Sequence, residues 1–114
     1  MSKEKPLSID EFPLTERTAR KIIIDLAKNH SNRVKLSKHA KIRMSQRGIS
    51  IRQVFSVLCS KHNIFTEGPF QEPNGDWKFN IKGVAAGDVI TLTIALKSHN
   101  YAPLAFIVTV WVKG

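Results

Sequence analysis

Residues 77–97, WKFNIKGVAAGDVITLTIALK, decide the fold. Apolar residues occupy every second position on both sides of a turn at Ala86-Gly87-Asp88, namely Trp77, Phe79 and Ile81 before it and Ile90, Leu92, Ile94 and Leu96 after it. A period of two places alternate side chains on opposite faces of a strand. The stretch therefore predicts two antiparallel strands that share one apolar face.

Two further strands are expected to flank this pair. Residues 63–72 precede it, are interrupted by Gly68-Pro69, and connect to it through Asn74-Gly75, a dipeptide that favours tight hairpin turns. The last strand follows residues 98–103, and its inward side chains are expected to be Leu104, Phe106, Val108, Val110 and Val112. Together these segments predict a meander of four antiparallel strands with one apolar face.

The first half of the chain predicts helices. Thr15 is a candidate N-cap for a helix that runs to about Asn29, and Ser50 for one from Ile51 to about Lys61. Between them, Ser37 caps a helix that stops at Gly48, which suits a left-handed end. Residues 33–36 are expected to be short and extended.

These elements predict a single α+β domain. With 114 residues, 42% of them hydrophobic, the chain can build one core. We expect the N-terminal helices to pack on one face of a curved, four-stranded antiparallel sheet. The domain is expected to span residues 14–114, preceded by a loose arm over residues 1–13.

All of the net charge lies in one segment. Residues 26–66 contain no Asp or Glu, and they carry nine basic side chains that equal the net charge of +9. We call this segment the basic block; Asp25 and Glu67 bound it. Such a one-sided charge favours a polyanionic partner, with nucleic acid as the leading class and anionic membrane second.

Other classes of protein are disfavoured. No stretch approaches the roughly 20 apolar residues of a membrane span, and no apolar segment of a secretory signal follows the N-terminus. The single Cys59 excludes an internal disulfide, and no pair of carboxylates or His/Asp cluster suggests a metal. We expect a cytoplasmic bacterial protein that uses no metal and no cofactor.

The face of the sheet turned away from the helices is expected to be polar. It would carry cations, hydroxyls and one large aromatic side chain, namely Lys78, Asn80, Lys82, Thr91, Thr93, Thr109, Trp111 and Lys113. Such a surface can grip phosphates and stack bases. An ordinary solvated face, where Thr is common because it suits strands, is an equally good interpretation.

The clearest motif lies inside the basic block, at residues 37–49, SKHAKIRMSQRGI. His39, Arg43 and Arg47 are spaced four residues apart, so they line one side of the predicted helix. A neutral imidazole can act as a general base, and two guanidinium groups can hold a phosphate. Each residue also has a purely local structural interpretation. Further RNA contacts are expected from Lys38, Lys41 and Arg52, and His99 is a second acid/base candidate.

The run from His39 to Ile49, followed by a helix and a meander that ends in residues 106–111, FIVTVW, resembles the family known as domain of unknown function 4258. The resemblance covers roughly residues 34–112. This family is similar to RelE-like and barnase-like ribonuclease folds, and its members look like toxins of bacterial toxin–antitoxin pairs. The resemblance implies that His39, Arg43, Arg47 and Thr109 are the catalytic positions.

We therefore expect a metal-independent endoribonuclease toxin whose partners are RNA and a cognate antitoxin protein, with no role at a membrane. The alternative is a non-catalytic module that binds nucleic acid or another protein. From the residues alone the two remain even; the resemblance favours the ribonuclease.

Overall fold

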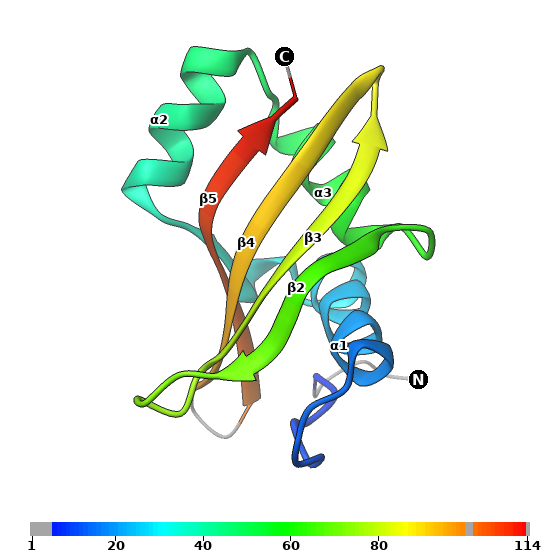
Figure 1. The fold of residues 1–114 in the computed structure, drawn as a ribbon, viewed down its shortest axis with the longest axis vertical. Coiled ribbons are helices and arrows are strands. Elements are labelled where there is room, and N and C mark those ends of the chain that lie inside the picture. Colours follow the sequence, from blue (N-terminus) through cyan, green and yellow to red (C-terminus); the bar gives the residue numbers. More distant parts are fainter. Residues whose placement is uncertain (1–5, 100–101, 114) are drawn as a thin grey trace.

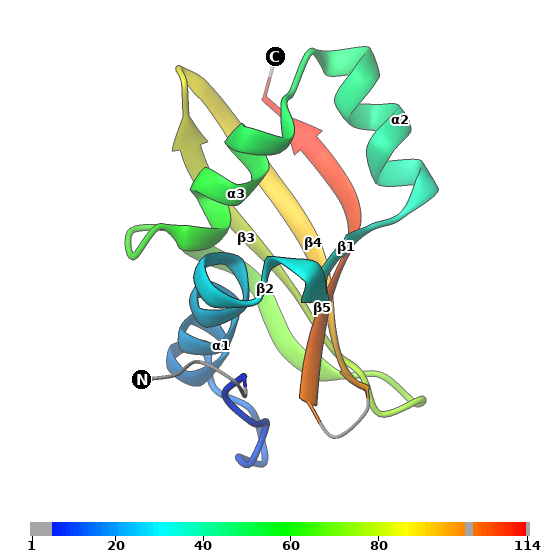
Figure 2. The same cartoon turned by 180° about the vertical axis from the view of Figure 1, so that it is seen from behind.

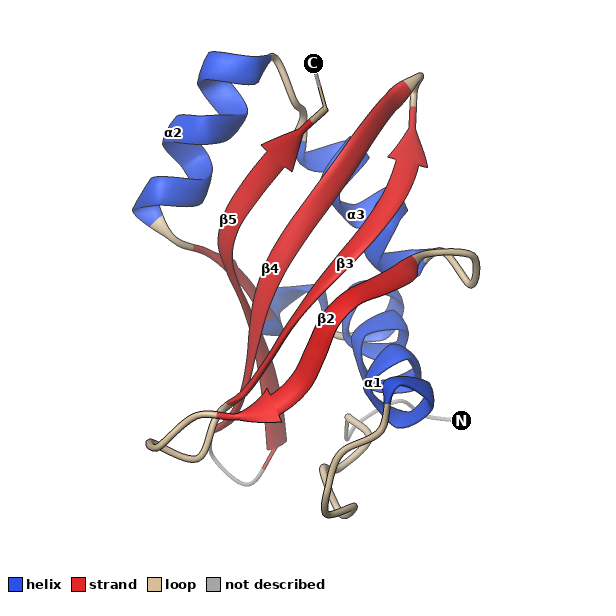
Figure 3. Ribbon diagram, viewed as in Figure 1, coloured by secondary structure: helices blue, strands red, loops and turns tan. Residues whose placement is uncertain are grey.

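The computed structural model describes residues 6–99 and 102–113. Within them the chain forms α1 (Glu16–Asn29), a short 3-10 turn η1 (Ser31–Arg33), β1 (Val34–Leu36), α2 (Lys38–Arg47) and α3 (Ile51–Cys59). The strands β2 (Ile64–Gln71), β3 (Trp77–Ala85), β4 (Asp88–His99) and β5 (Ala102–Val112) complete it (Figures 1 and 3). The predicted α+β class is confirmed, but the helices do not all precede the sheet, because β1 lies between α1 and α2.

The sheet has five strands among the described residues, in the order β1-β5-β4-β3-β2, and it is not closed. The predicted meander from β2 to β5 is antiparallel as expected, but β1 pairs with β5 in parallel, with Val34 opposite Ala105 and Leu36 opposite Ile107. The prediction of a purely antiparallel, four-stranded sheet was therefore wrong. Three residues are too few to show alternation, so nothing local identifies β1 as a strand.

The helices α1 and α3 cover one face of the sheet (Figure 2). They bury an apolar layer between helices and strands, which includes Ile22, Ile23, Leu26, Val54, Leu58, Phe79, Ile81, Leu92 and Ile94. The opposite face carries no helix in the described residues (Figure 1). We call this second face the open face. None of the described helices is long and apolar enough to cross a membrane.

The helix α2 does not join the other two on the covered face. It lies beside β5 at the edge of the sheet in both views (Figures 1 and 2). Its N-cap Ser37 anchors it there, because the Ser37 amide donates to Ile107 O at 3.0 Å and the Ser37 hydroxyl donates to Val108 O at 2.7 Å. Ala40 and Met44 bury the inner side of the helix. Ala40 and Met44 belong to the same core as the buried side chains of α1 and α3, so the prediction that the helices pack on one face holds for α1 and α3 and only in part for α2.

A β-bulge changes the orientation of β5 at Val108. Thr93 pairs with Thr109 but Ile94 pairs with Ile107, which leaves Val108 as an extra residue. Before the bulge, Ala105 and Ile107 are buried in the core, where Leu104, Phe106 and Val108 had been expected. After it, Val110 is buried as predicted. The predicted alternation therefore holds only for the last part of the strand.

The predicted helix caps are confirmed. Thr15, Ser37 and Ser50 each accept a hydrogen bond from a first-turn amide, and Gly48 ends α2 at φ 67°. The helix α3 ends two residues before the expected Lys61, because the Asn63 side chain donates to Val57 O and Ser60 O at its end.

Before α1, residues 6–13 form no helix or strand. Ile9 nonetheless packs against the core, and the ring of Phe12 meets the ring of Trp77 edge-on at 5.7 Å.

Candidate functional site

A row of polar side chains crosses the open face. Glu67 of β2, Asn80 of β3, Thr93 of β4 and Thr109 of β5 lie directly opposite one another in adjacent strands. Three strand spacings make this row about 14 Å long. We call it the polar row. Its four residues line a groove of about 310 Å³, together with Phe70, Lys78, Phe79, Val108 and Trp111.

The floor of the groove contains two buried threonine residues. Thr93 and Thr109 are each only 8% exposed, although they face away from the helices. The Thr109 Oγ1 is fully buried and has no hydrogen-bond partner among the described residues. A buried polar atom without a partner typically costs about 1–3 kcal/mol, so this hydroxyl is a ready contact for a ligand oxygen.

The helix α2 contributes a cation, Arg43, next to the part of the groove that β5 forms. The guanidinium carbon of Arg43 lies 5.3 Å from the centre of the Trp111 ring, a cation–π distance. The Arg43 Nε is buried and has no hydrogen-bond partner in the described part of the chain. Trp111 itself is 51% exposed and follows Thr109 by two residues, so both lie on the open face. Arg43, Thr109 and Trp111 therefore combine a cation, an unpaired hydroxyl and an exposed aromatic ring; we call them the β5 end of the groove.

His39 and Arg47 flank Arg43 on α2. Each lies one helical turn away, about 6 Å along the axis, on the side of the helix that presents Arg43 to the sheet. Both side chains are exposed, and neither lines the groove. Among the described residues the His39 side chain makes no hydrogen bond, so no third group orients its ring. His99, the second acid/base candidate, has a side chain outside the described residues.

The predicted cations are only partly brought together. Lys78 lines the groove, and Lys82 lies in the next row of the open face, opposite Thr91, which in turn faces Trp111. Lys113 follows directly after β5 and is exposed, as are Lys38 and Lys41 on α2. Arg52 lies on α3, against the covered face, and so belongs to a different surface.

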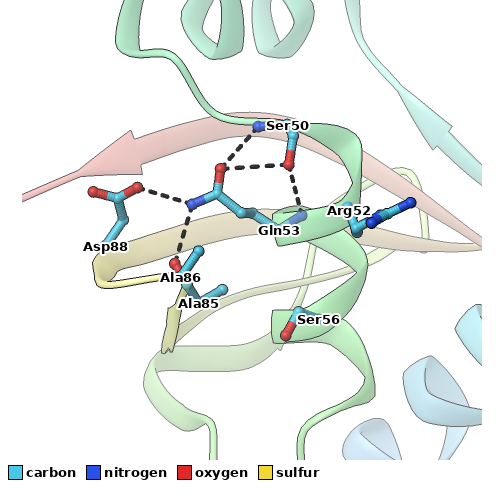
Figure 4. Close-up of a pocket in the computed structure, with 7 residues that line it drawn as sticks. All are labelled: Ser50, Arg52, Gln53, Ser56, Ala85, Ala86 and Asp88. Carbon is cyan, nitrogen blue, oxygen red and sulfur yellow. Dashed lines mark hydrogen bonds between the residues drawn. The ribbon is translucent and has the colours of Figure 1, made fainter.

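That other surface holds a larger pocket of about 470 Å³, between the start of α3 and the β3–β4 turn (Figure 4). Its central side chain, Gln53, donates to Ala85 O at 3.0 Å and to the Asp88 carboxylate at 2.8 Å. The Gln53 carbonyl oxygen accepts from the Ser50 amide at 3.0 Å, which closes a capping box. Arg52 points away from this cluster in Figure 4. The hydrogen bonds of Gln53 are therefore already used to tie α3 to the turn.

Metal binding and thiol chemistry are two alternatives for the described residues. No group of three or more His, Cys, Asp or Glu side chains gathers there to hold a metal ion. Burial raises the pKa of the Cys59 thiol, with an opposing effect of Lys28, and this disfavours a reactive thiolate.

Glu67, Phe70 and Val108 line the groove but were not predicted to do so. In β2 the register shifts on both sides of Glu67, so simple alternation could not assign its face. Val108 reaches the groove through the bulge. The contact between Arg43 and Trp111 was missed because α2 was expected behind the sheet. In the sequence, the position of Arg43 within the motif was the signal that pointed to a functional contact of this residue.

Comparison with known proteins gives one match. A family model described as "Domain of unknown function (DUF4258)" matches residues 36–112, well over half of the chain. The match includes α2 with His39, Arg43 and Arg47, and it extends through β5 to Thr109 and Trp111. No curated protein and no solved structure matches the chain. The chain therefore belongs to the DUF4258 family.

Proposed function

We propose that the protein is a metal-independent endoribonuclease, and that it acts as the toxin of a bacterial toxin–antitoxin pair. The observation that carries the proposal is the β5 end of the groove, where Arg43 lies over Trp111 and the hydroxyl of nearby Thr109 has no partner among the described residues. A base can stack on the exposed indole while the guanidinium and the hydroxyl hold the adjoining phosphate. The net charge of +9 supports binding of a polyanion at this site.

The proposed reaction starts with the ribose 2′-hydroxyl. Its oxygen forms a bond to the adjacent phosphorus while His39 accepts the hydroxyl proton. The bond from phosphorus to the 5′-oxygen then breaks, this oxygen takes a proton from water, and the proton held by His39 passes to the hydroxide that remains. The products are a 2′,3′-cyclic phosphate and a free 5′-hydroxyl. Arg43 and Arg47 offset the negative charge that builds on the phosphate.

The position of α2 supports these roles. Because the helix runs alongside β5, an RNA backbone that leaves the groove past Trp111 crosses the side of α2 that carries Arg43. His39 lies one turn away on that side, so the proposal requires the RNA backbone to run along α2 from Arg43 to His39.

A cognate antitoxin is part of the same proposal. It would cover Trp111 and Arg43, since exposed Trp and Arg side chains are the residues in which interface energy concentrates. An acidic antitoxin would also associate fastest with a toxin of this charge.

A second candidate is a module that binds RNA without cleaving it. One observation favours it: no group orients the His39 ring among the described residues, whereas a catalytic base is commonly held by a third side chain.

Induced expression in a bacterium separates the two candidates. The proposed toxin stops growth and leaves cut RNA, and the His39→Ala variant does neither while it accumulates to the same level. Undiminished growth with intact RNA, on induction of the wild-type protein, would favour the binding module.

A further inference from the structure

The groove has a cation beside its β5 end and a carboxylate at its β2 end. Arg43 stands at its β5 end, whereas Glu67 lies at the β2 end of the polar row. Lys78 also lines it and lies opposite Phe70 of β2, near Glu67, whereas Asn80, Thr93 and Thr109 carry no charge. A carboxylate repels phosphate, so the part of a bound RNA that contacts Glu67 itself is a hydrogen-bond donor and not the backbone.

The local backbone holds Glu67 in this position. The pairing of β2 with β3 shifts register both before and after Glu67. Glu67 therefore pairs with Asn80 between two breaks in the regular strand pairing. Next to it, Gly68 adopts φ +76°, and a Cβ there would lie 2.5 Å from Lys78 O. Only glycine fits this close approach of the strands. Bulges of this kind re-aim side chains and are frequent beside functional sites.

At the β2 end, Glu67 and Asn80 together present mainly hydrogen-bond acceptors. The Asn80 Nδ2 donates to Glu67 Oε1 at 3.2 Å, which orients the carboxylate and uses one of the amide's donors. The second carboxylate oxygen and the Asn80 carbonyl oxygen remain as acceptors. Glu67 and Phe70 are both exposed, so a ligand can reach the acceptors and rest on the Phe70 ring.

These observations identify the part of RNA that fits. A nucleotide offers a phosphate at one end and the hydrogen-bonding edge of a base at the other. The phosphate suits Arg43 at the β5 end of the groove, and the base edge suits the acceptors of Glu67 and Asn80 at the β2 end. Guanine presents two adjacent N–H donors on that edge, the number that a carboxylate can accept side by side. Adenine and cytosine present an amino donor beside an acceptor nitrogen, and uracil presents one N–H between two carbonyl oxygens.

We infer that Glu67, positioned by Asn80, reads a base at the β2 end of the groove, and that it selects guanine. This inference rests on the proposed binding of RNA to the open face. Specificity for the base is thereby separated from the Arg43–Trp111 pair, which contacts features common to all RNA. A well-placed pair of hydrogen bonds to a base edge corresponds to a preference of about 10-fold to 100-fold over the wrong base.

The test uses 2′-O-methyl RNA, which cannot be cleaved because its 2′-oxygen carries no proton. Four uridine decamers are compared, one without substitution and three with a single central guanosine, adenosine or cytidine. Dissociation constants are measured by fluorescence anisotropy. We expect the wild-type protein to bind the guanosine probe at least about 10-fold more tightly than the other three.

Two variants with the same change of charge complete the test. Glu67→Gln should reduce the preference for guanosine to less than about 3-fold, whereas Glu16→Gln, at an exposed position on α1, should retain it. Equal binding of all four probes by the wild-type protein would overturn the inference and leave the RNA-binding surface standing. Absence of binding to every probe would overturn the inference together with the proposed function. The wild-type comparison holds whether or not Glu67→Gln folds.

Discussion

Replacing Thr109 by Val tests whether the groove keeps a polar atom ready for a ligand. The Thr109 hydroxyl is buried and unpartnered among the described residues, and Val has nearly the same shape and suits a strand equally well. Removing an unsatisfied hydroxyl should recover part of a penalty of about 1–3 kcal/mol. We expect Thr109→Val to be more stable than the wild-type protein by about 1 kcal/mol, which raises the melting temperature by about 4 °C.

The same substitution should weaken RNA binding. A hydrogen bond to a charged group contributes about 1.5–3 kcal/mol, so loss of the contact with phosphate should lower affinity by roughly 10-fold to 100-fold. Few substitutions both raise the free energy of unfolding and lower the affinity for RNA. This combination would indicate that the hydroxyl contributes to ligand binding and not to folding. Calorimetric melting and fluorescence anisotropy with a short RNA measure the two effects.

Thr91→Val is the matched control. Thr91 lies on the open face opposite Trp111, but it is partly exposed and its hydroxyl is not a buried, unpartnered group. We expect its stability to stay within about 0.5 kcal/mol of the wild-type value. If Thr109→Val instead destabilised the protein and bound RNA normally, the hydroxyl would be a structural group and the reasoning would be refuted.

Two further predictions concern the cations. Arg43→Ala should abolish RNA cleavage. Arg43→Lys should restore only a small part of it, because an ammonium group cannot form the planar fork that holds phosphate. Full activity of Arg43→Lys in a gel assay would show that charge alone suffices. The affinity for RNA should fall by about three to five decades between 50 and 200 mM salt if about 6–10 phosphates are bound. A nearly flat salt titration would exclude the basic block as the binding site.

The sequence predicted the elements whose signals are local. The caps at Thr15, Ser37 and Ser50 each act within one helical turn, and the alternation in residues 77–97 needs only neighbouring residues, so these parts were predicted correctly. The pairing of β1 with β5 depends on contacts between residues about 70 positions apart, such as Val34 and Ala105, and the bulge at Val108 depends on the register between β4 and β5. No local pattern encodes such contacts.

The candidate site shows the same division. Arg43, Thr109 and Trp111 were identified one by one, from the motif, the resemblance and the outward face of a strand. Their assembly into one end of a groove depends on α2 lying at the sheet edge, which the sequence did not predict. Glu67 was missed because the irregular register of β2 decides which face it occupies.

The most direct test of the central claim is the fate of purified RNA. A single-stranded RNA is incubated with purified protein in buffer that contains EDTA, and the products are resolved on a gel and analysed for their end groups. The wild-type protein should cut the RNA and leave 2′,3′-cyclic phosphate and 5′-hydroxyl ends, whereas His39→Ala, folded to the same melting temperature, should be slower by at least about 100-fold. Intact RNA, cleavage that requires added magnesium, or equal cleavage by His39→Ala would contradict the proposed mechanism.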